Sequence, residues 1–309
     1  MGTRLTIRPP SDFVLRRDVC SYGYFLLAPN FWDPDRQSLT RIFDLDVGAA
    51  AVTLTQAPVK RGGPIAARAD RALSRAEQGE LRRQVGRMLR LDEDPAAFHR
   101  VDPRWKRSGR GRLFRSPTFF EDVVKTVTSC NVTWPGTMRM NRRLCEMINP
   151  AFPSPEQLAR KRPAWLRSRC GVGYRDVRLV ELGRLFASGE VEAAWFEDPD
   201  RSDEEVDTAL RALPGVGPYA SANIMQLLGR CSRIAMDTEA VRHGREALGM
   251  TGSTRAVERA LQAHYEPFGE HKFRSYWFEM WTRYEEGRGP AWTWEPETTG
   301  ATLTLPDKA

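Results

Sequence analysis

Short apolar runs alternate with polar, proline and glycine residues over the first 73 positions of the chain. Period-two alternation and β-branched residues, which are typical of strands, occur in the runs TRLTI, YFLLA, AVTLTQ and PIAAR. Between them, SLTRIFDL is compatible with one helix. The first part of the chain is therefore predicted to form a small antiparallel sheet with one helix.

Helical periodicity begins at Ser74 and dominates from about residue 95 onward. Ser74 and Glu77 have capping-box spacing, and the apolar positions that follow recur every three or four residues. The same start signal recurs at Ser154 with Gln157 and at Ser202 with Glu205. These patterns predict a mainly helical remainder.

The fold class that follows is α+β and mainly helical, with a small N-terminal antiparallel sheet and an all-helical domain. We place the sheet-rich domain at residues 1–94 and the helical domain at residues 95–287. Residues 288–309 are rich in proline and threonine and are expected to form an irregular tail.

Composition narrows the class of protein. Of the 309 residues 41% are hydrophobic, which excludes a mainly disordered chain. No apolar run reaches the roughly 18 residues that a membrane span needs. The five cysteines are odd in number and widely spaced, which indicates reduced thiols and excludes a spaced zinc or iron–sulfur site. We expect no metal and no cofactor.

The charge balance favours a polyanionic partner. Lys and Arg number 47 against 40 Asp and Glu, which gives a net charge of +7. A genome with high arginine usage explains the surplus equally well. Seven basic residues lie between Arg100 and Arg115, whereas Glu190 to Asp207 is acidic and is interpreted as a solvated surface.

The segment from Leu210 to Asp237 is the most informative, and it predicts a helix, a tight turn and a second helix. Glycines in the turn allow a close approach of the backbone, and a proline suits the first turn of the second helix. Amide groups that face outward there form a site for a phosphate. Taken alone, the turn could also be a mere connector. The turn residues are Leu213, Pro214, Gly215, Val216, Gly217 and Pro218.

The pattern LPGVGxxA, followed by an Asp about 20 residues past the turn, resembles the helix–hairpin–helix (HhH-GPD) DNA glycosylase superfamily. The resemblance implies that the hairpin grips one DNA strand by its phosphates. It also implies that Asp237 lies against the sugar of a flipped nucleotide as the catalytic carboxylate. Without the hairpin, an Asp before TEAV would be interpreted as a helix N-cap.

Other segments extend the resemblance, which is nearest to the oxidised-purine and alkylpurine branches. FFEDVVKTVTSCNVTWPGTM resembles the first helices of the glycosylase domain, where Asn131 would enter the gap left by the extruded base. In CGVGYRDV, Arg175 is expected either to contact a phosphate or to cap a helix. The resemblance covers the helical domain well and the N-terminal domain loosely.

One departure from the family pattern concerns the reaction. Members with lyase activity carry a Lys two residues past the second glycine of the hairpin, where this chain has Tyr219. The resemblance therefore implies hydrolysis without strand cleavage. No cysteine follows Cys231, so the cluster of the iron–sulfur members is not expected.

The flipped base is expected to stack on aromatic or apolar side chains, although ordinary core packing is the alternative for each candidate. The candidates for this base pocket are Tyr219, Tyr174, Trp134, Tyr276, Trp277 and Met280.

The sequence thus predicts a monofunctional DNA glycosylase that acts on double-stranded DNA as a monomer, in the bacterial cytoplasm or the nucleus. A bifunctional glycosylase/lyase that uses another lysine, such as Lys125, is one alternative. A non-enzymatic DNA-binding protein is another. The excised base stays open, and so does a role in defence against modified viral DNA instead of repair.

Overall fold

The computed structural model describes residues 2–57 and 62–302. The chain divides into two compact units. The first unit comprises Met1–Asp94, Arg112–Glu192 and Pro290–Thr302, and the second comprises Pro95–Gly111 and Ala193–Gly289. These units do not follow the domain boundaries predicted at residues 94 and 287. The predicted boundaries stay a prediction.

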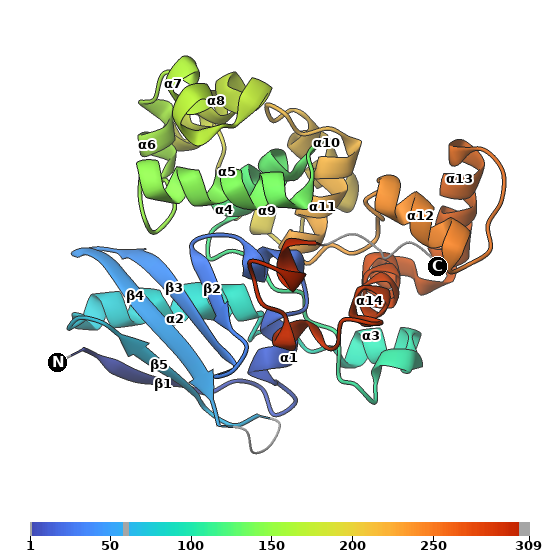
Figure 1. Ribbon diagram of the computed structural model, residues 1–309, viewed down its shortest axis with the longest axis horizontal. Helices are drawn as coiled ribbons and strands as arrows, with labels where there is room; N and C mark the ends of the chain where they lie inside the picture. Colours follow the sequence, from blue (N-terminus) through green and yellow to red (C-terminus); the bar gives the residue numbers. More distant parts are fainter. Residues whose placement is uncertain (1, 58–61, 303–309) are drawn as a thin grey trace. The chain divides into compact units, whose positions relative to one another are not determined.

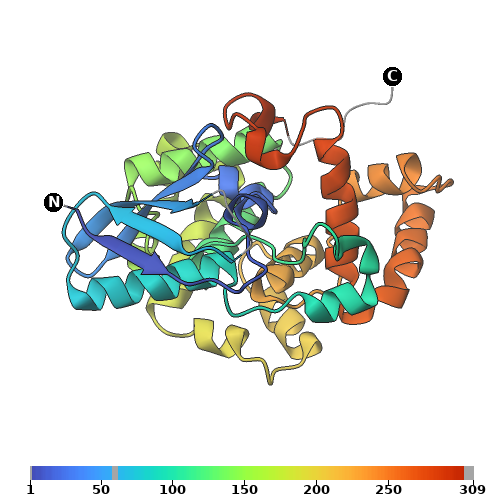
Figure 2. The same cartoon turned by 90° about the horizontal axis from the view of Figure 1, so that it is seen from below.

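A five-stranded antiparallel sheet forms the front of the first unit, with the strand order β1-β5-β4-β3-β2 (Figure 1). A two-residue turn joins β3 to β4, where Leu45 pairs with Gly48. Helix α2 (Arg75–Leu89) packs on the sheet through Leu81, Val85 and Met88 (Figure 2). The strands are β1 Arg4–Ile7, β2 Asn30–Asp33, β3 Ser38–Leu45, β4 Gly48–Gln56 and β5 Ile65–Ala69.

Two local predictions in this part of the chain are wrong. SLTRIFDL is strand β3 and not a helix, because Leu39, Arg41, Phe43 and Leu45 are buried at every second position. The strand also pairs with neighbours on both sides, β2 and β4. YFLLA is not a strand: most of it forms the 3-10 helix η1 (Gly23–Leu26), whose residues are all buried.

A buried ionic cluster joins β3 to α4, one of the remaining helices of the first unit. Arg41 of β3 donates to Glu121 of α4 over 3.0 and 2.6 Å, and Lys125 lies 2.7 Å from the same carboxylate. All three side chains are at most 3% exposed, so each charge depends on the others for compensation. These helices are α1 Leu15–Val19, α4 Phe119–Ser129, α5 Trp134–Met147, α6 Pro155–Ala159, α7 Pro163–Cys170, η3 Gly173–Arg175 and α8 Asp176–Ala187.

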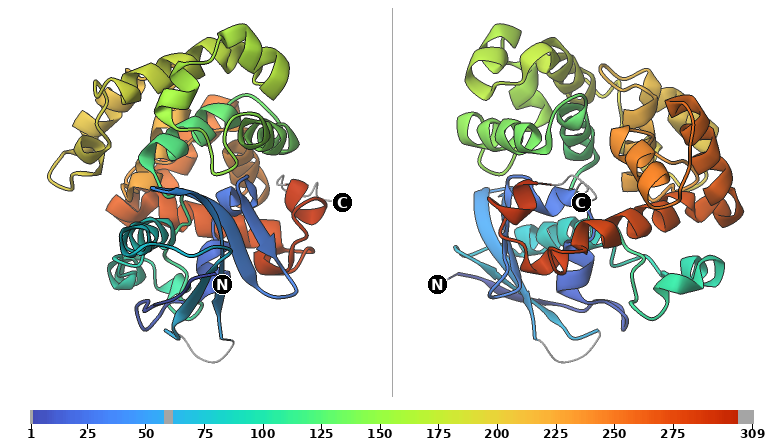
Figure 3. Two further views of the ribbon diagram at one scale, coloured as in Figure 1. Left: turned by 90° about the vertical axis from the view of Figure 1, so that its left-hand side faces the viewer. Right: turned by 45° about the vertical axis from the view of Figure 1, so that its right-hand side comes forward.

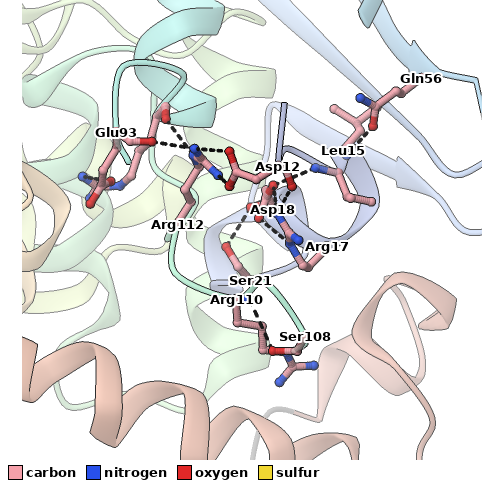
Figure 4. Close-up of polar contacts among 12 residues, drawn as sticks. Asp12, Leu15, Arg17, Asp18, Ser21, Gln56, Glu93, Ser108, Arg110 and Arg112 are labelled. Atoms are coloured by element: carbon pink, nitrogen blue, oxygen red, sulfur yellow. Dashed lines mark hydrogen bonds and ion pairs between the residues drawn. The ribbon is translucent and has the colours of Figure 1, made fainter. Parts of the chain in front are cut away.

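A buried arginine anchors the chain where it re-enters the first unit. The guanidinium of Arg112 is 1% exposed and donates to the Asp12 carboxylate (Figure 4). It also donates to the carbonyls of Arg90 and Glu93. Arg112 is one of the seven basic residues between Arg100 and Arg115, and it has a structural role.

The second unit is helical in its described part. A capping box begins α10 at the predicted serine, as capping boxes begin α2 and α6 in the first unit. In each box the serine accepts from the amide three residues later. Helix α12 packs on α13 (Figure 3). The helices are α3 Ala96–Val101, η2 Pro103–Trp105, α9 Ala193–Glu197, α10 Asp203–Arg211, α11 Pro218–Leu228, α12 Thr238–Glu246, α13 Thr254–Tyr265, η4 Glu266–His271 and α14 Lys272–Glu285.

The segment predicted as an irregular tail contributes to the core of the first unit. Its described part, up to residue 302, contains the short 3-10 helices η5 (Ala291–Thr293) and η6 (Thr299–Ala301). Trp294 is 1% exposed, and the indole of Trp32 donates to the carbonyl of Trp292 over 2.9 Å. Among the described helices, none is long and apolar enough to cross a membrane.

Replacement of Glu121 by Gln is expected to destabilise the protein by about 3–5 kcal/mol, because Arg41 and Lys125 lose their shared buried counter-ion. Unfolding in urea, followed by circular dichroism, measures the change. The control is Glu80→Gln, which breaks the solvent-exposed pair with Arg83 and should cost less than about 1 kcal/mol. Equal effects of the two substitutions would contradict the importance of the buried cluster.

Candidate active site

The predicted hairpin forms between α10 and α11. Leu213 and Val216 are each 6% exposed and plug the turn, and the amide of Val216 donates to the carbonyl of Leu213 over 3.1 Å. Gly215 has φ +84°, a conformation that a side chain would strain. Pro214 precedes this glycine, and Pro218 is the first residue of α11, as the sequence predicted.

The outer face of the hairpin is open. A Cβ atom at Gly217 would meet no atom of the described chain within 4 Å, and the φ of Gly217 is an ordinary −96°. Neither packing nor backbone conformation therefore requires a glycine here. The N-terminal end of a helix is a common place for an anion to bind, because the backbone amides there point outward along the axis.

Asp237 begins α12. Its Oδ1 accepts from the amide of Ala240 over 2.8 Å, so the residue is the N-cap that the isolated sequence would suggest. The hydroxyl of Tyr219, on the first turn of α11, donates to the same carboxylate. The hairpin and the carboxylate thus meet through one side-chain hydrogen bond within the second unit.

The surroundings of Asp237 shift its titration. Burial raises the pKa of its carboxyl group, and the negative charge of Glu239 adds to the rise. The amide of Ala240 and the hydroxyl of Tyr219 oppose it by donating to the ionised form. The result is a pKa of about 6, so the group is mostly ionised at neutral pH while it is poorly hydrated.

Helix α14 brings two more of the predicted pocket residues toward Asp237. Tyr276 and Met280 are 2% and 3% exposed, and the hydroxyl of Tyr276 donates to the Met280 Sδ over 3.2 Å. Burial and the charge of Asp237 raise the pKa of Tyr276, so its hydroxyl stays protonated. Tyr219 and Tyr276 therefore lie near Asp237 in one unit, and Met280 contacts Tyr276.

The sequence reasoning missed Tyr284, which follows Met280 by one helical turn. It is 4% exposed, and its hydroxyl is 3.9 Å from the Met280 Sδ. Burial, followed by the charges of Glu239 and Asp237, raises its pKa. The spacing of Tyr276, Met280 and Tyr284, four residues apart each time, was the signal available in the sequence.

The other predicted pocket residues lie elsewhere. Trp277 stacks on Phe273 and Trp281, with ring centroids 5.8 and 5.4 Å away, in a second stripe along α14. Trp134 and Tyr174 belong to the first unit, at the start of α5 and in η3. A part for them in a base pocket stays a prediction.

Asn131 and Tyr174 meet within the first unit. The amide of Asn131 donates to the Tyr174 hydroxyl over 3.3 Å, and Asn131 adopts φ +51° in the turn between α4 and α5. Both side chains are exposed. Arg175 is 5% exposed and donates to the carbonyls of Val127 and Cys130 at the end of α4. These bonds correspond to the helix-capping alternative for Arg175, and its contact with DNA stays a prediction.

Some of the basic residues between Arg100 and Arg115 pair with acidic side chains of the second unit. Arg104 donates to both oxygens of Asp102 and to Glu279, and Arg110 pairs with Glu285. Arg100, Lys106 and Arg107 are exposed, and so is Arg104 in spite of its ion pairs. Within the described ranges, no group of three or more His, Cys, Asp or Glu side chains has the arrangement of a metal site.

The Tyr219→Phe substitution tests the geometry around the carboxylate. Removal of the hydroxyl donor destabilises the ionised form, so the pKa of Asp237 should rise above about 6. A ¹³C NMR titration of the Asp237 carboxyl group measures it. Tyr265→Phe is the control, because that hydroxyl bonds to His243 and not to Asp237. An unchanged or lowered midpoint in Tyr219→Phe would contradict the contact.

No family model matches the chain, and no curated protein matches it in sequence. Solved structures do match it. A 3-methyladenine DNA-glycosylase from Archaeoglobus fulgidus has a TM-score of 0.68 at 16% identity, over 90% of this chain and 98% of the other. The apo form of an 8-oxoguanine glycosylase/lyase from Clostridium acetobutylicum gives 0.65 at 17% identity, over 90% and 97%.

The same Clostridium enzyme, in complex with double-stranded DNA that contains cytosine opposite 8-oxoguanine, gives a TM-score of 0.64 at 17% identity, over 90% and 97%. Identities this low establish similarity of fold. The fold includes both the small antiparallel sheet and the helical part, as the sequence predicted. The protein therefore has the fold of the helix–hairpin–helix DNA glycosylases.

Proposed function

We propose that the protein is a monofunctional DNA glycosylase. It extrudes a damaged or modified base from duplex DNA and hydrolyses the N-glycosidic bond, which leaves an abasic site. The observation that carries the proposal is the poorly hydrated carboxylate of Asp237, hydrogen-bonded to the first turn of the helix that the open hairpin begins. The fold shared with DNA glycosylases supports the same reaction class.

The chemistry needs a fixed negative charge. Cleavage of a glycosidic bond places positive charge on the sugar, and a carboxylate that is already oriented stabilises it. At about 4 Å and an effective dielectric constant near 20, opposite charges attract by about 4 kcal/mol. That energy corresponds to about a thousandfold in rate, so one ionised carboxylate is a sufficient catalytic group.

The N-cap geometry supports this role for Asp237. One carboxylate oxygen, Oδ1, accepts the amide of Ala240, which fixes the orientation of the group. Because the pKa of Asp237 is about 6, the group is ionised above that pH and is available to the sugar cation and to the attacking water. Activity should therefore rise as the pH rises through about 6.

Hydrolysis without strand cleavage is favoured over lyase chemistry. A lyase forms a Schiff base through an amine, and Tyr219 provides a phenol hydroxyl beside the carboxylate instead. Lys125, the alternative amine, is 0% exposed and paired with Glu121 in the core of the first unit. A side chain so enclosed does not reach a sugar without loss of the buried cluster.

The DNA partner follows from two features of the surface. The hairpin offers backbone donors to phosphates, and the exposed Asn131 side chain is suited to replace an extruded base in the stack. A protein that only holds DNA is the competing function. Such a protein does not need a half-buried carboxylate next to its hairpin, because partial burial of that charge destabilises the fold.

Asp237→Asn is expected to keep DNA binding and to lose nearly all base release. The variant should fold, so unfolding does not account for the lost activity. Because the pKa of Asp237 is raised to about 6, the free energy of unfolding of the wild type falls as the pH rises through that value. The Asn variant, which keeps an N-cap acceptor, should be more stable at pH 8 by roughly 1–3 kcal/mol. Thermal unfolding at pH 4 and pH 8 checks the sign.

The assay is a panel of duplexes that carry alkylated purines, 8-oxoguanine, uracil, mismatched thymine, and hydroxymethylated or glucosylated cytosine. Products are treated with and without alkali. Cleavage that requires alkali supports a monofunctional enzyme and identifies its base; a glucosylated substrate would indicate defence. Strand cleavage without alkali, or an adduct trapped by borohydride, would refute the monofunctional assignment. Full activity of Asp237→Asn would refute the catalytic carboxylate.

DNA affinity should depend steeply on salt. With about four to six phosphates contacted, the slope of log affinity against log salt concentration is expected to be about −4 to −5. Fluorescence anisotropy with a duplex that contains an abasic-site analogue measures this slope between about 50 and 200 mM salt. A flat response would argue against binding through phosphates.

A further inference from the structure

The loop that leads to Asp237 is fixed to the first helix of the hairpin by ionic contacts. This loop runs from Gly229, which ends α11 with φ +98°, to the N-cap of α12. Arg230 donates to Asp203 over 2.8 Å, and Ser232 donates to the same carboxylate. The acidic run that the sequence suggested to be a solvated surface therefore holds the catalytic loop in place.

Asp207 is the central group of this contact. Its carboxylate accepts the Ser221 hydroxyl over 2.6 Å, Arg211 Nε over 3.0 Å and Arg233 Nη1 over 3.0 Å. Ser221 lies in α11, Arg211 in α10 and Arg233 in the loop, four residues before Asp237. One carboxylate thus joins both helices of the hairpin to the loop.

The contact is built to persist. Asp207 is 8% exposed and Ser221 is 0% exposed, so water competes little with these bonds. Burial alone would raise the pKa of Asp207, but the hydrogen bonds from Ser221 and Arg211 and the charge of Arg233 lower it below its ordinary value. The group stays ionised across the neutral range and keeps all three partners.

We propose that Asp207 and Arg233 are positioning residues that hold Asp237 at a set distance from the phosphate-binding hairpin. The inference rests on the proposed function and deepens it. In a nucleotide the phosphate and the sugar C1′ are separated by a fixed number of bonds. A hairpin that grips the phosphate can therefore present the sugar correctly only to a carboxylate whose place is fixed relative to that hairpin.

The magnitude at stake follows from this geometry. Displacement of a catalytic group by about 1 Å can cost about 100-fold in rate. Other contacts also hold the loop: Arg230 and Ser232 act near its start, and the amide of Phe273 donates to the carbonyl of Cys231. Arg233 is the anchor nearest to Asp237 among these contacts.

The chain offers a matched pair for the test. Arg211 and Arg233 each contact Asp207 over 3.0 Å, but Arg211 lies in the same helix as Asp207 whereas Arg233 joins the loop. Arg233→Met removes the connection of the loop to Asp207, together with a longer contact of 3.5 Å to Glu204. Arg211→Met removes an equal charge and the same 3.0 Å contact with Asp207 without releasing the loop. Arg233→Lys restores a cation at reduced reach.

The first readout is single-turnover base release by saturating protein on the duplex that the wild type cleaves. Arg233→Met should slow release about 10- to 100-fold while affinity for an abasic-analogue duplex changes less than about 3-fold. Arg211→Met should stay within about 3-fold of the wild type, and Arg233→Lys should recover part of the loss. Equal rates for the two methionine variants would overturn the proposal.

The second readout needs no substrate. A released loop hydrates Asp237, so the ¹³C midpoint of its carboxyl group should fall from about 6 toward the ordinary range in Arg233→Met and stay unchanged in Arg211→Met. If the wild type releases no base but the midpoint falls in Arg233→Met alone, the proposed function fails and the positioning role stands. An unchanged midpoint in both variants would overturn the positioning role.

Discussion

The carboxyl group of Asp237 is subject to two opposed demands. Burial favours its neutral form, whereas stabilisation of a sugar cation needs the anion. The amide of Ala240 and the hydroxyl of Tyr219 supply part of the solvation that water would otherwise give. The amide at the start of α12 and the Tyr219 hydroxyl next to the hairpin therefore stabilise the same carboxylate. Because these two donors keep the carboxylate charged near neutral pH, the rings of the nearby tyrosines can form an otherwise apolar surrounding.

The same physical device recurs where the chain must hold a precise shape. Glu121, Asp207 and Asp12 each accept from arginines, and the donors come from segments distant in sequence. In the first unit the pairs fix the sheet to α4 and the re-entering chain to the segment that precedes α1. In the second unit they fix the hairpin to the loop before α12. A buried anion with several donors specifies geometry more strictly than an apolar contact of the same size, because each donor has a direction.

Local signals in the sequence predicted much of the fold. The capping boxes at Ser74, Ser154 and Ser202 were confirmed, because each depends on residues within one helical turn. SLTRIFDL was assigned to a helix because its pairing with β2 and β4 is non-local, and periodicity in eight residues is ambiguous. The α+β fold class was confirmed through the hairpin motif and the structural matches.

The candidate site was predictable only in part. Asp237 and Tyr219 were predicted from the resemblance of the hairpin motif, and Tyr276 and Met280 as aromatic or apolar candidates near the end of the helical part. Trp277 could not be separated from them by sequence, since one residue along a helix turns a side chain by about 100°. Asp207 and Arg233 were hidden for another reason. Acidic and basic residues on a surface look alike in sequence, and only the fold shows which of them face each other.

Gly217 shows what kind of pressure acts on the hairpin. Its backbone angle suits any residue, and a Cβ there would touch no atom of the described chain. A requirement for folding therefore gives no reason for a glycine at this position. The proposed grip on a DNA strand gives such a reason, because a phosphate backbone that lies against the main chain leaves no room for a side chain. On this proposal, Gly217 serves the bound DNA strand and not the folding of the chain.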